Sequence, residues 1–255
     1  MSNTTRFALQ FLKSSQPRLA SALLPQDCVL CGDDDPNCAQ TTDGEARPWA
    51  PHLCTACRDS LPYLSASSCP ICALPSTEAV VCGRCIARPP HYDATRAAVA
   101  YAYPIEPLVR HCKYHGVVAL AALLGNLLDN AIADCAPPDL LTAIPLSGIR
   151  LAQRGFNQAL EIARPLAKRR GLVLNAGFCH RVRHTDAQAD LPFAQRRNNV
   201  RGAFACTENL AGMHIAVVDD VMTTGDTLDE FARTLKARGA ARVENWVVAR
   251  TLPRG

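Results

Sequence analysis

The chain has 255 residues, of which 48% are hydrophobic and 20% charged, a composition typical of a folded protein with one substantial core and one small additional domain. No apolar run reaches about 18 residues, so no transmembrane helix is expected. The net charge of +4 is mild, and most of the basic surplus follows residue 90, which fits a polyphosphate ligand as well as a nucleic acid.

The first 27 residues contain several apolar side chains but no convincing cleavage pattern of a signal peptide. We expect an N-terminal helical segment over residues 1–27, amphipathic and packed on the rest of the protein.

Eight of the 13 cysteines form four Cys-x-x-Cys pairs in the next part of the chain. The pairs are Cys28/Cys31, Cys54/Cys57, Cys69/Cys72 and Cys82/Cys85. Four pairs supply two tetrahedral Cys₄ sets, the closed geometry of structural zinc, whereas a redox dithiol needs only one pair. We therefore expect two Zn²⁺ ions in a double zinc ribbon over residues 28–88. Sequential pairing is the simpler arrangement, and a crossed pairing stays open.

Zinc-binding thiolates rather than disulfides indicate a reducing compartment, so we expect a cytoplasmic protein. The remaining cysteines of the C-terminal part are isolated in the sequence and are interpreted as small apolar residues. They are Cys112, Cys135, Cys179 and Cys206. Pro89-Pro90 marks a boundary, after which a second domain extends over residues 91–255.

Strands and helices are expected to alternate through the second domain. The expected strands are Ala94–Tyr103, Leu140–Pro145 and Leu172–Leu174, and the expected helices are Pro107–Asn130, interrupted at Gly116, and Gln158–Arg170, ended by Gly171. This alternation predicts an α/β fold with a parallel sheet, helices on both faces, and ligands beyond the carboxyl ends of the strands.

A polar, arginine-rich segment lies between Cys179 and Phe204. It includes Arg181, Arg183, Arg196, Arg197 and Arg201. A connection of this length inside a compact domain is usually functional or disordered. We interpret it as a flexible basic flap that closes over a pyrophosphate and excludes water from a reactive sugar.

The most informative stretch runs from Ile215 to Leu228. A continuous apolar run, Ile215–Val218, predicts a buried parallel strand, and the acidic residues Asp219 and Asp220 follow at its end. The turn Thr223–Thr227 then opens a helix, and its backbone N–H groups are expected to converge on an anion. No Gly-Lys-Ser/Thr is present, so a nucleoside triphosphatase is disfavoured. Two carboxylates beside a phosphate site suit a sugar phosphate with Mg²⁺.

This stretch resembles the phosphoribosyl pyrophosphate (PRPP) motif of type I phosphoribosyltransferases. The chain as a whole resembles the ComF family over roughly residues 22–251. Besides the cysteine pairs and the PRPP motif, the resemblance is carried by Lys113–Gly116, Ile144–Arg150, Arg154–Gln158, Arg183–Gln188 and Arg196–Phe204. It implies a type I phosphoribosyltransferase fold, preceded by a double zinc ribbon, in which the arginine-rich segment forms a flexible hood. It also implies an association with competence and DNA uptake.

The resemblance also implies roles for individual residues. Asp219 and Asp220 would hold the ribose hydroxyls, directly or through Mg²⁺. The 5′-phosphate would be bound by Thr223, Thr224, Gly225 and Thr227. The pyrophosphate would meet Ser147 to Arg150, with Arg154 nearby and Lys113 as a further cation, and the hood would contribute Arg183, Arg196 and Arg197.

The acceptor of the transferred sugar is not identified by the sequence. Purine-salvage relatives place an Asp where this chain has Thr223, which cannot serve as a base. The chain begins Met1-Ser2, so an ammonia-producing glutaminase with an N-terminal cysteine is not expected either. Three interpretations stay open: a phosphoribosyltransferase with an unknown acceptor, a non-catalytic PRPP-binding accessory protein in DNA uptake that contacts single-stranded DNA or DNA-uptake proteins, and a zinc-ribbon interaction module whose transferase domain is a relic.

Overall fold

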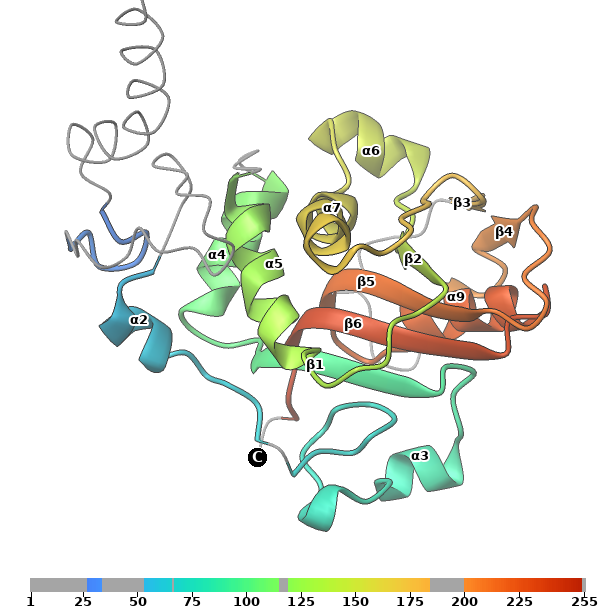
Figure 1. Cartoon of the computed structure of the whole chain (residues 1–255), viewed down its shortest axis with the longest axis horizontal. Coiled ribbons are helices and arrows are strands. Elements are labelled where there is room, and N and C mark those ends of the chain that lie inside the picture. Colours follow the sequence, from blue (N-terminus) through green and yellow to red (C-terminus); the bar gives the residue numbers. More distant parts are fainter. Residues whose placement is uncertain (1–26, 34–52, 66, 115–118, 184–199, 254–255) are drawn as a thin grey trace, which may run out of the picture. The chain divides into compact units, whose positions relative to one another are not determined.

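A computed structural model of the chain describes residues 27–33, 53–65, 67–114, 119–183 and 200–253 (Figure 1). The chain forms two compact units, Met1–Leu61 and Pro62–Gly255. The helix expected before residue 27 lies outside the described residues, and the domain limits 28–88 and 91–255 stay a prediction. None of the described helices combines the length and apolar character that a membrane crossing requires.

The described part of the first unit is small and centres on four cysteines. Its helix α2 (Thr55–Asp59) begins directly after Cys54, whose Sγ accepts a hydrogen bond from the backbone N–H of Cys57 at 3.4 Å. Apart from cysteines, its buried apolar side chains among the described residues are Leu53 and Leu61. The core formed by these described residues is small, as is typical of a zinc-binding segment that the metal stabilises.

The second unit is built on a four-stranded parallel sheet of order β1-β6-β5-β2. The strands are β1 (Ala94–Ala100), β6 (Arg242–Arg250), β5 (His214–Met222) and β2 (Leu140–Ala143). The central strands are buried on both faces: Ile215 to Val218 of β5 are fully inaccessible, as are most residues of β6. The predicted α/β class with a parallel sheet is confirmed.

Helices cover both faces of this sheet. They are α4 (Ile105–Tyr114), α5 (Ala119–Ala131), α7 (Gln158–Arg170) and α9 (Asp226–Lys236). The connection from β1 to β2 crosses the sheet in the opposite direction to that from β5 to β6, so right-handed crossovers place α5 on one face and α9 on the other. Helix α7, which follows β2, packs against α5 on the same face (Figure 1). In α9, Leu228, Phe231, Ala232 and Leu235 recur at helical spacing and are all buried.

A cysteine-containing segment of the second unit packs beside β1. Tyr63 forms an antiparallel bridge with Val99, and the Ala100 N–H donates to the carbonyl of Pro62 at 2.7 Å. The segment continues through η1 (Thr77–Ala79) and α3 (Gly83–Ala87). A separate antiparallel pair, β3 (Cys179–Arg181) and β4 (Phe204–Cys206), joins the two ends of the arginine-rich segment.

Several elements differ from the sequence-based expectation. Strand β5 continues to Met222, so Asp219 and Asp220 lie within its last part rather than after its end, because β6 continues to pair alongside them. The stretch after Ser147, for which no helix was expected, begins helix α6 (Gly148–Arg154), which Ser147 caps through its Oγ. Leu172–Leu174 contributes one bridge, between Leu174 and Leu141.

Candidate functional site

A cavity of about 440 Å³ lies at the carboxyl ends of β2 and β5. This is the edge of an open α/β sheet where ligands are expected. The cavity is lined by Lys113, Tyr114, Ile144, Pro145, Leu146, Arg150, Gln153, Arg154, Gln158, Arg181, Asp219, Asp220, Val221, Thr223 and Thr227. Two carboxylates and four cationic side chains therefore line one pocket.

The two carboxylates, Asp219 and Asp220, form the acidic pair of this cavity. Asp219 Oδ1 accepts the backbone N–H of Asp220 at 2.8 Å, and Asp220 forms an ion pair with Lys113, whose Nζ lies 2.8 Å from Asp220 Oδ2. Burial, reinforced by the charge of Asp220, raises the pKa of Asp219 to about 8. Burial acts to lower the pKa of Lys113, but the Asp220 carboxylate outweighs it and raises that pKa.

Burial disfavours the ionised form of Asp219, and a cation bound to the acidic pair would stabilise that form. Adjacent carboxylate oxygens are the donors that Mg²⁺ prefers in protein sites. The residues present therefore fit a magnesium ion.

Three arginines from two different elements also line the cavity. Arg150 and Arg154 belong to α6, and Arg181 ends β3. Arg154 donates to Gln158 Oε1 at 2.9 Å, and its guanidinium lies 5.1 Å from the centre of the Tyr114 ring. Burial, and then the nearby charge of Arg150, lower the pKa of Arg181 to about 10. Positive charges held this close together favour a polyanionic ligand.

The turn Thr223–Thr227, here called the phosphate loop, connects β5 to α9. Thr223 and Thr227 line the cavity. Gly225 immediately precedes α9 with φ of +88°, and a Cβ on it would lie 2.6 Å from Met222 Cε and 3.1 Å from Tyr92 Oη. Only glycine fits this position. Thr224 is buried, and its hydroxyl donates to Asp226 Oδ2 at 2.5 Å.

The structure brings together most, but not all, of the residues expected at the site. Those around the cavity are Lys113, Arg150, Arg154, Asp219, Asp220, Thr223 and Thr227. Ser147 is buried at the start of α6, and Thr224 and Gly225 line a smaller pocket beside Cys72 and Arg84. Arg183 donates to the carbonyl of Arg201 at 2.6 Å. Arg196 and Arg197 lie outside the described residues.

Three features of the site go beyond the sequence-based assignment. Arg181, expected only as part of the basic flap, lines the cavity itself, and Tyr114, which was given no role in binding, contributes an exposed ring to it. Arg250 is 1% exposed and bonds to the backbone beneath the phosphate loop. In the sequence, the only sign of this role is that an arginine directly follows the apolar run Val247–Ala249, and the partners of that arginine are distant in sequence.

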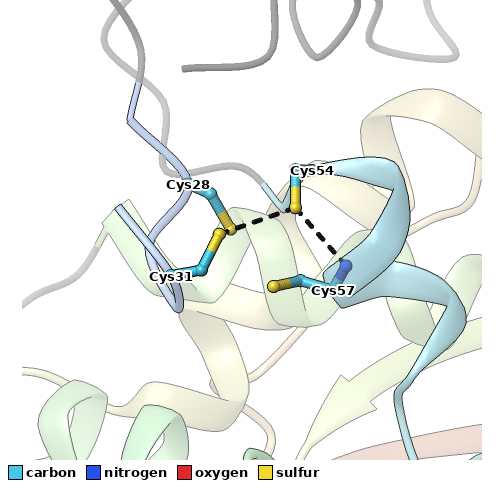
Figure 2. Close-up of side chains that lie close together, drawn as sticks. All are labelled: Cys28, Cys31, Cys54 and Cys57. Carbon is cyan, nitrogen blue, oxygen red and sulfur yellow. Dashed lines mark hydrogen bonds between the residues drawn. The ribbon is translucent and has the colours of Figure 1, made fainter. Parts of the chain in front are cut away.

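The eight paired cysteines form two sets of four. They are Cys28, Cys31, Cys54 and Cys57 in the first unit, and Cys69, Cys72, Cys82 and Cys85 in the second. Within each set the sulfur atoms lie within 4.8 Å of one another. Figure 2 shows the first set, whose side chains converge from two short segments of the chain. The grouping is the sequential one.

The electrostatics of both sets fit a bound dication. Burial opposes ionisation of Cys28 and Cys69, but backbone N–H groups lower the pKa of Cys28 to about 6 and that of Cys69 to about 7. Neighbouring sulfurs raise the pKa of Cys57, and burial with Cys72 raises that of Cys85. Four thiolates therefore do not ionise together unless a cation offsets their repulsion, and Zn²⁺ supplies that charge in Cys₄ sites.

Comparison with known proteins agrees with both parts of the chain. Residues 138–252 match the phosphoribosyl transferase domain, and residues 19–86 match the double zinc ribbon domain. The fold and site thus define a protein with a phosphoribosyltransferase domain and a cysteine-rich structural zinc module.

Similar proteins match most of the chain. The DNA utilization protein YhgH of Salmonella typhimurium is 33% identical over 207 residues, which cover 78% of this chain and 91% of that protein. Competence protein F of Haemophilus influenzae is 29% identical over 211 residues, which cover 78% of this chain and 90% of that protein. The chain belongs to the ComF family. Among solved structures, the chain is similar to a purine phosphoribosyltransferase from Pyrococcus horikoshii Ot3. The match covers 51% of this chain and 81% of that chain, at 17% sequence identity and a TM-score of 0.31.

Proposed function

We propose that the protein binds PRPP together with Mg²⁺ in the cavity at the end of β5, and that it is a phosphoribosyltransferase whose acceptor is unidentified. The observation that carries this proposal is the combination of charges: the acidic pair lines one pocket together with the cations Lys113, Arg150, Arg154 and Arg181. PRPP needs both signs of charge, because its ribose hydroxyls and metal require carboxylates and its phosphates require cations.

The ligand would extend across the cavity from the phosphate loop to α6. The acidic pair would hold the ribose hydroxyls, and the phosphate loop would bind the 5′-phosphate through Thr223, Thr224, Gly225 and Thr227. Ser147, Arg150, Arg154 and Lys113 would bind the pyrophosphate, with Arg183, Arg196 and Arg197 contributed by the hood. Arg181 is added to this set because it lines the cavity.

Transfer requires the bond between the anomeric carbon and the pyrophosphate oxygen to break, with the electron pair leaving on pyrophosphate, while the acceptor bonds to that carbon. Mg²⁺, when bound, offsets the charge of the leaving pyrophosphate. The arginines of the cavity would stabilise the same charge from the protein side. Thr223 cannot act as a base, so the acceptor would be a nucleophile that needs no proton removal by this residue.

The test is direct titration of the protein with PRPP, with and without Mg²⁺, followed by an acceptor screen that measures pyrophosphate release. We expect heat of binding that depends on Mg²⁺, and release of pyrophosphate with one class of acceptor. Absence of PRPP binding would exclude the proposal, whereas binding without turnover against any acceptor would favour a non-catalytic role.

That non-catalytic role is the second candidate. Relatives named DNA utilization protein and competence protein F suggest an accessory protein that couples PRPP binding to DNA uptake. Its partners would be single-stranded DNA or DNA-uptake proteins. Aromatic residues make up only 5% of the chain, so any grip on DNA would rely on phosphate contacts and lose affinity steeply with salt. A filter-binding series at rising salt distinguishes this candidate.

For the cysteine sets we propose one zinc ion each, in a reducing cytoplasm. Elemental analysis of the untagged protein should give about two zinc ions per chain, one for each set of four ligands. Protein without zinc, and with these cysteines oxidised to disulfides in mass spectra, would refute the assignment.

A further inference from the structure

The second cysteine set lies directly behind the phosphate loop. Arg84 sits on α3 between Cys82 and Cys85, and its Nη2 donates to the carbonyl of Thr224 at 2.6 Å. A pocket of only about 40 Å³ separates the two parts, and its lining includes Cys72, Cys85 and Gly225. The cysteine set and the loop are therefore in near contact within one unit.

A second arginine joins the same two parts from the end of β6. Arg250 Nε donates to the carbonyl of Cys72 at 2.8 Å, and its Nη1 donates to the carbonyl of Met222 at 2.9 Å and also to that of Thr223. The side chain is 1% exposed. Three consecutive carbonyls, those of Met222, Thr223 and Thr224, are thus bound by guanidinium groups on the side of the cysteine set.

These bonds have a consequence for the opposite side of the loop. In a trans peptide the C=O and the following N–H point in opposite directions, and the one cis peptide among the described residues is Tyr103-Pro104. Fixing the three carbonyls toward the cysteine set therefore turns the N–H groups of Thr223, Thr224 and Gly225 away from it. Positive charge behind the carbonyls also polarises these peptides and strengthens their N–H groups as donors.

We propose that the second cysteine set, with its zinc ion, positions the phosphate loop through Arg84 and Arg250, so that metal occupancy controls affinity for a ribose 5-phosphate group. This inference rests on the proposed function. The zinc-ribbon segment has little apolar core, so its four ligands are held in place chiefly by the metal. Arg84 and the Cys72 carbonyl are fixed only while that segment is ordered. Arg84 and Arg250 are positioning residues, since they act through the loop backbone.

The variant Arg84→Met tests the inference without removing a metal ligand. Arg84 is exposed apart from its bonded head group, so the substitution should leave folding and zinc content unchanged. Losing one charge-assisted bond should weaken ribose 5-phosphate binding about five- to tenfold by calorimetry. Binding of inorganic pyrophosphate with Mg²⁺ should not change, and Arg84→Lys should restore part of the loss. Arg88→Met removes the same charge from the same segment and serves as the control.

The metal itself is tested by a matched pair of ligand substitutions. Cys82→Ser and Cys57→Ser should each lower the zinc content, but only Cys82→Ser should weaken ribose 5-phosphate binding. Hydrogen exchange at residues 222–227 should become faster in Cys82→Ser and Arg84→Met, and not in Cys57→Ser or Arg88→Met.

The outcomes separate this inference from the proposed function. Unchanged ribose 5-phosphate affinity in Arg84→Met and Cys82→Ser would overturn the positioning role while PRPP binding by the wild type stands. If the wild type binds neither PRPP nor ribose 5-phosphate, the proposed function fails. Exchange at residues 222–227 then decides the positioning role alone, and identical exchange in all variants would overturn it.

Discussion

Lys113 Nζ lies 2.8 Å from Asp220 Oδ2, at the point where the acidic pair would receive a metal ion. The lysine comes from the end of α4, and the aspartate from the last part of β5. Two cations, Lys113 and Mg²⁺, would therefore compete for one carboxylate. Binding of Mg²⁺–PRPP would free the ammonium to contact the pyrophosphate.

Replacing Lys113 by Met should accordingly have opposite effects on two ligands. The affinity for Mn²⁺ alone should rise at least about threefold because the cation that competes for Asp220 is gone. The affinity for Mg²⁺–PRPP should fall about tenfold because a charge-assisted contact to pyrophosphate is lost. Calorimetry measures both, and a change in the same direction for both ligands would contradict the exchange of partners.

The raised pKa of Asp219 predicts a pH dependence of binding. With a pKa of about 8 the carboxyl is protonated in the free protein at neutral pH, whereas a metal ion binds the carboxylate. Binding of Mg²⁺–PRPP should therefore release a proton, and affinity should rise between about pH 6.5 and pH 8.5. Titrations in buffers of different ionisation enthalpy count the protons. Asp219→Asn controls for titration of PRPP itself, and an unaltered pH slope in that variant would rule out Asp219 as the source.

The same shift has the opposite sign for folding. Above the ordinary value of 3.8 the unfolded chain has lost a proton that folded Asp219 keeps, so stability falls as pH rises from there toward about 8. Asp219→Asn removes this loss. The melting temperature of the variant should therefore exceed that of the wild type by a margin that grows with pH in this window. A difference in melting temperature that stays constant across this pH window would show that the pKa of Asp219 is not raised in the folded protein.

The arginine-rich segment from Arg181 to Arg201 separates the enzymatic from the DNA-binding interpretation. If it is a hood over pyrophosphate, PRPP should protect it from trypsin, and ribose 5-phosphate, which lacks the pyrophosphate, should protect it far less. If its arginines track a DNA backbone, single-stranded DNA should protect it, and the protection should fade with salt. Mass spectrometry of the limited digests locates the cleavage sites. Identical digestion with and without PRPP would contradict the interpretation of this segment as a hood over pyrophosphate.

The fold of the second unit could be predicted largely from local patterns. The helix Gln158–Arg170 has the expected limits because Asn157 and Gly171 cap it. Helix α6 was missed because Ser147 to Arg150 was assigned to pyrophosphate binding and not recognised as the start of a helix that Ser147 caps. The end of β5 was placed too early because acidic residues are uncommon within buried strands. In the structure, β5 continues to pair with β6, and Asp219 lies opposite Val247.

Long-range contacts could not be predicted. Cys179 and Cys206 were interpreted as isolated, but they lie opposite each other on β3 and β4. The bond from Arg250 to Cys72 joins residues 178 positions apart, and no local pattern encodes it. The sequence did predict the composition of the site, because the acidic pair and the phosphate loop are contiguous. The contribution of Arg181 depends on how β3 packs, which only the folded chain determines.

The most direct test of the account is the affinity for PRPP of the double variant Asp219→Asn/Asp220→Asn. The substitution keeps the size of both side chains and removes their charge, so Mg²⁺-dependent PRPP binding should weaken at least tenfold, or about 1.4 kcal/mol. Asp139→Asn, at a carboxylate that bonds the N–H of His214 at the other end of β5, should bind PRPP like the wild type. Equal affinity in the wild type and the double variant, measured by calorimetry in the same buffer, would contradict the assignment of the acidic pair as the PRPP site.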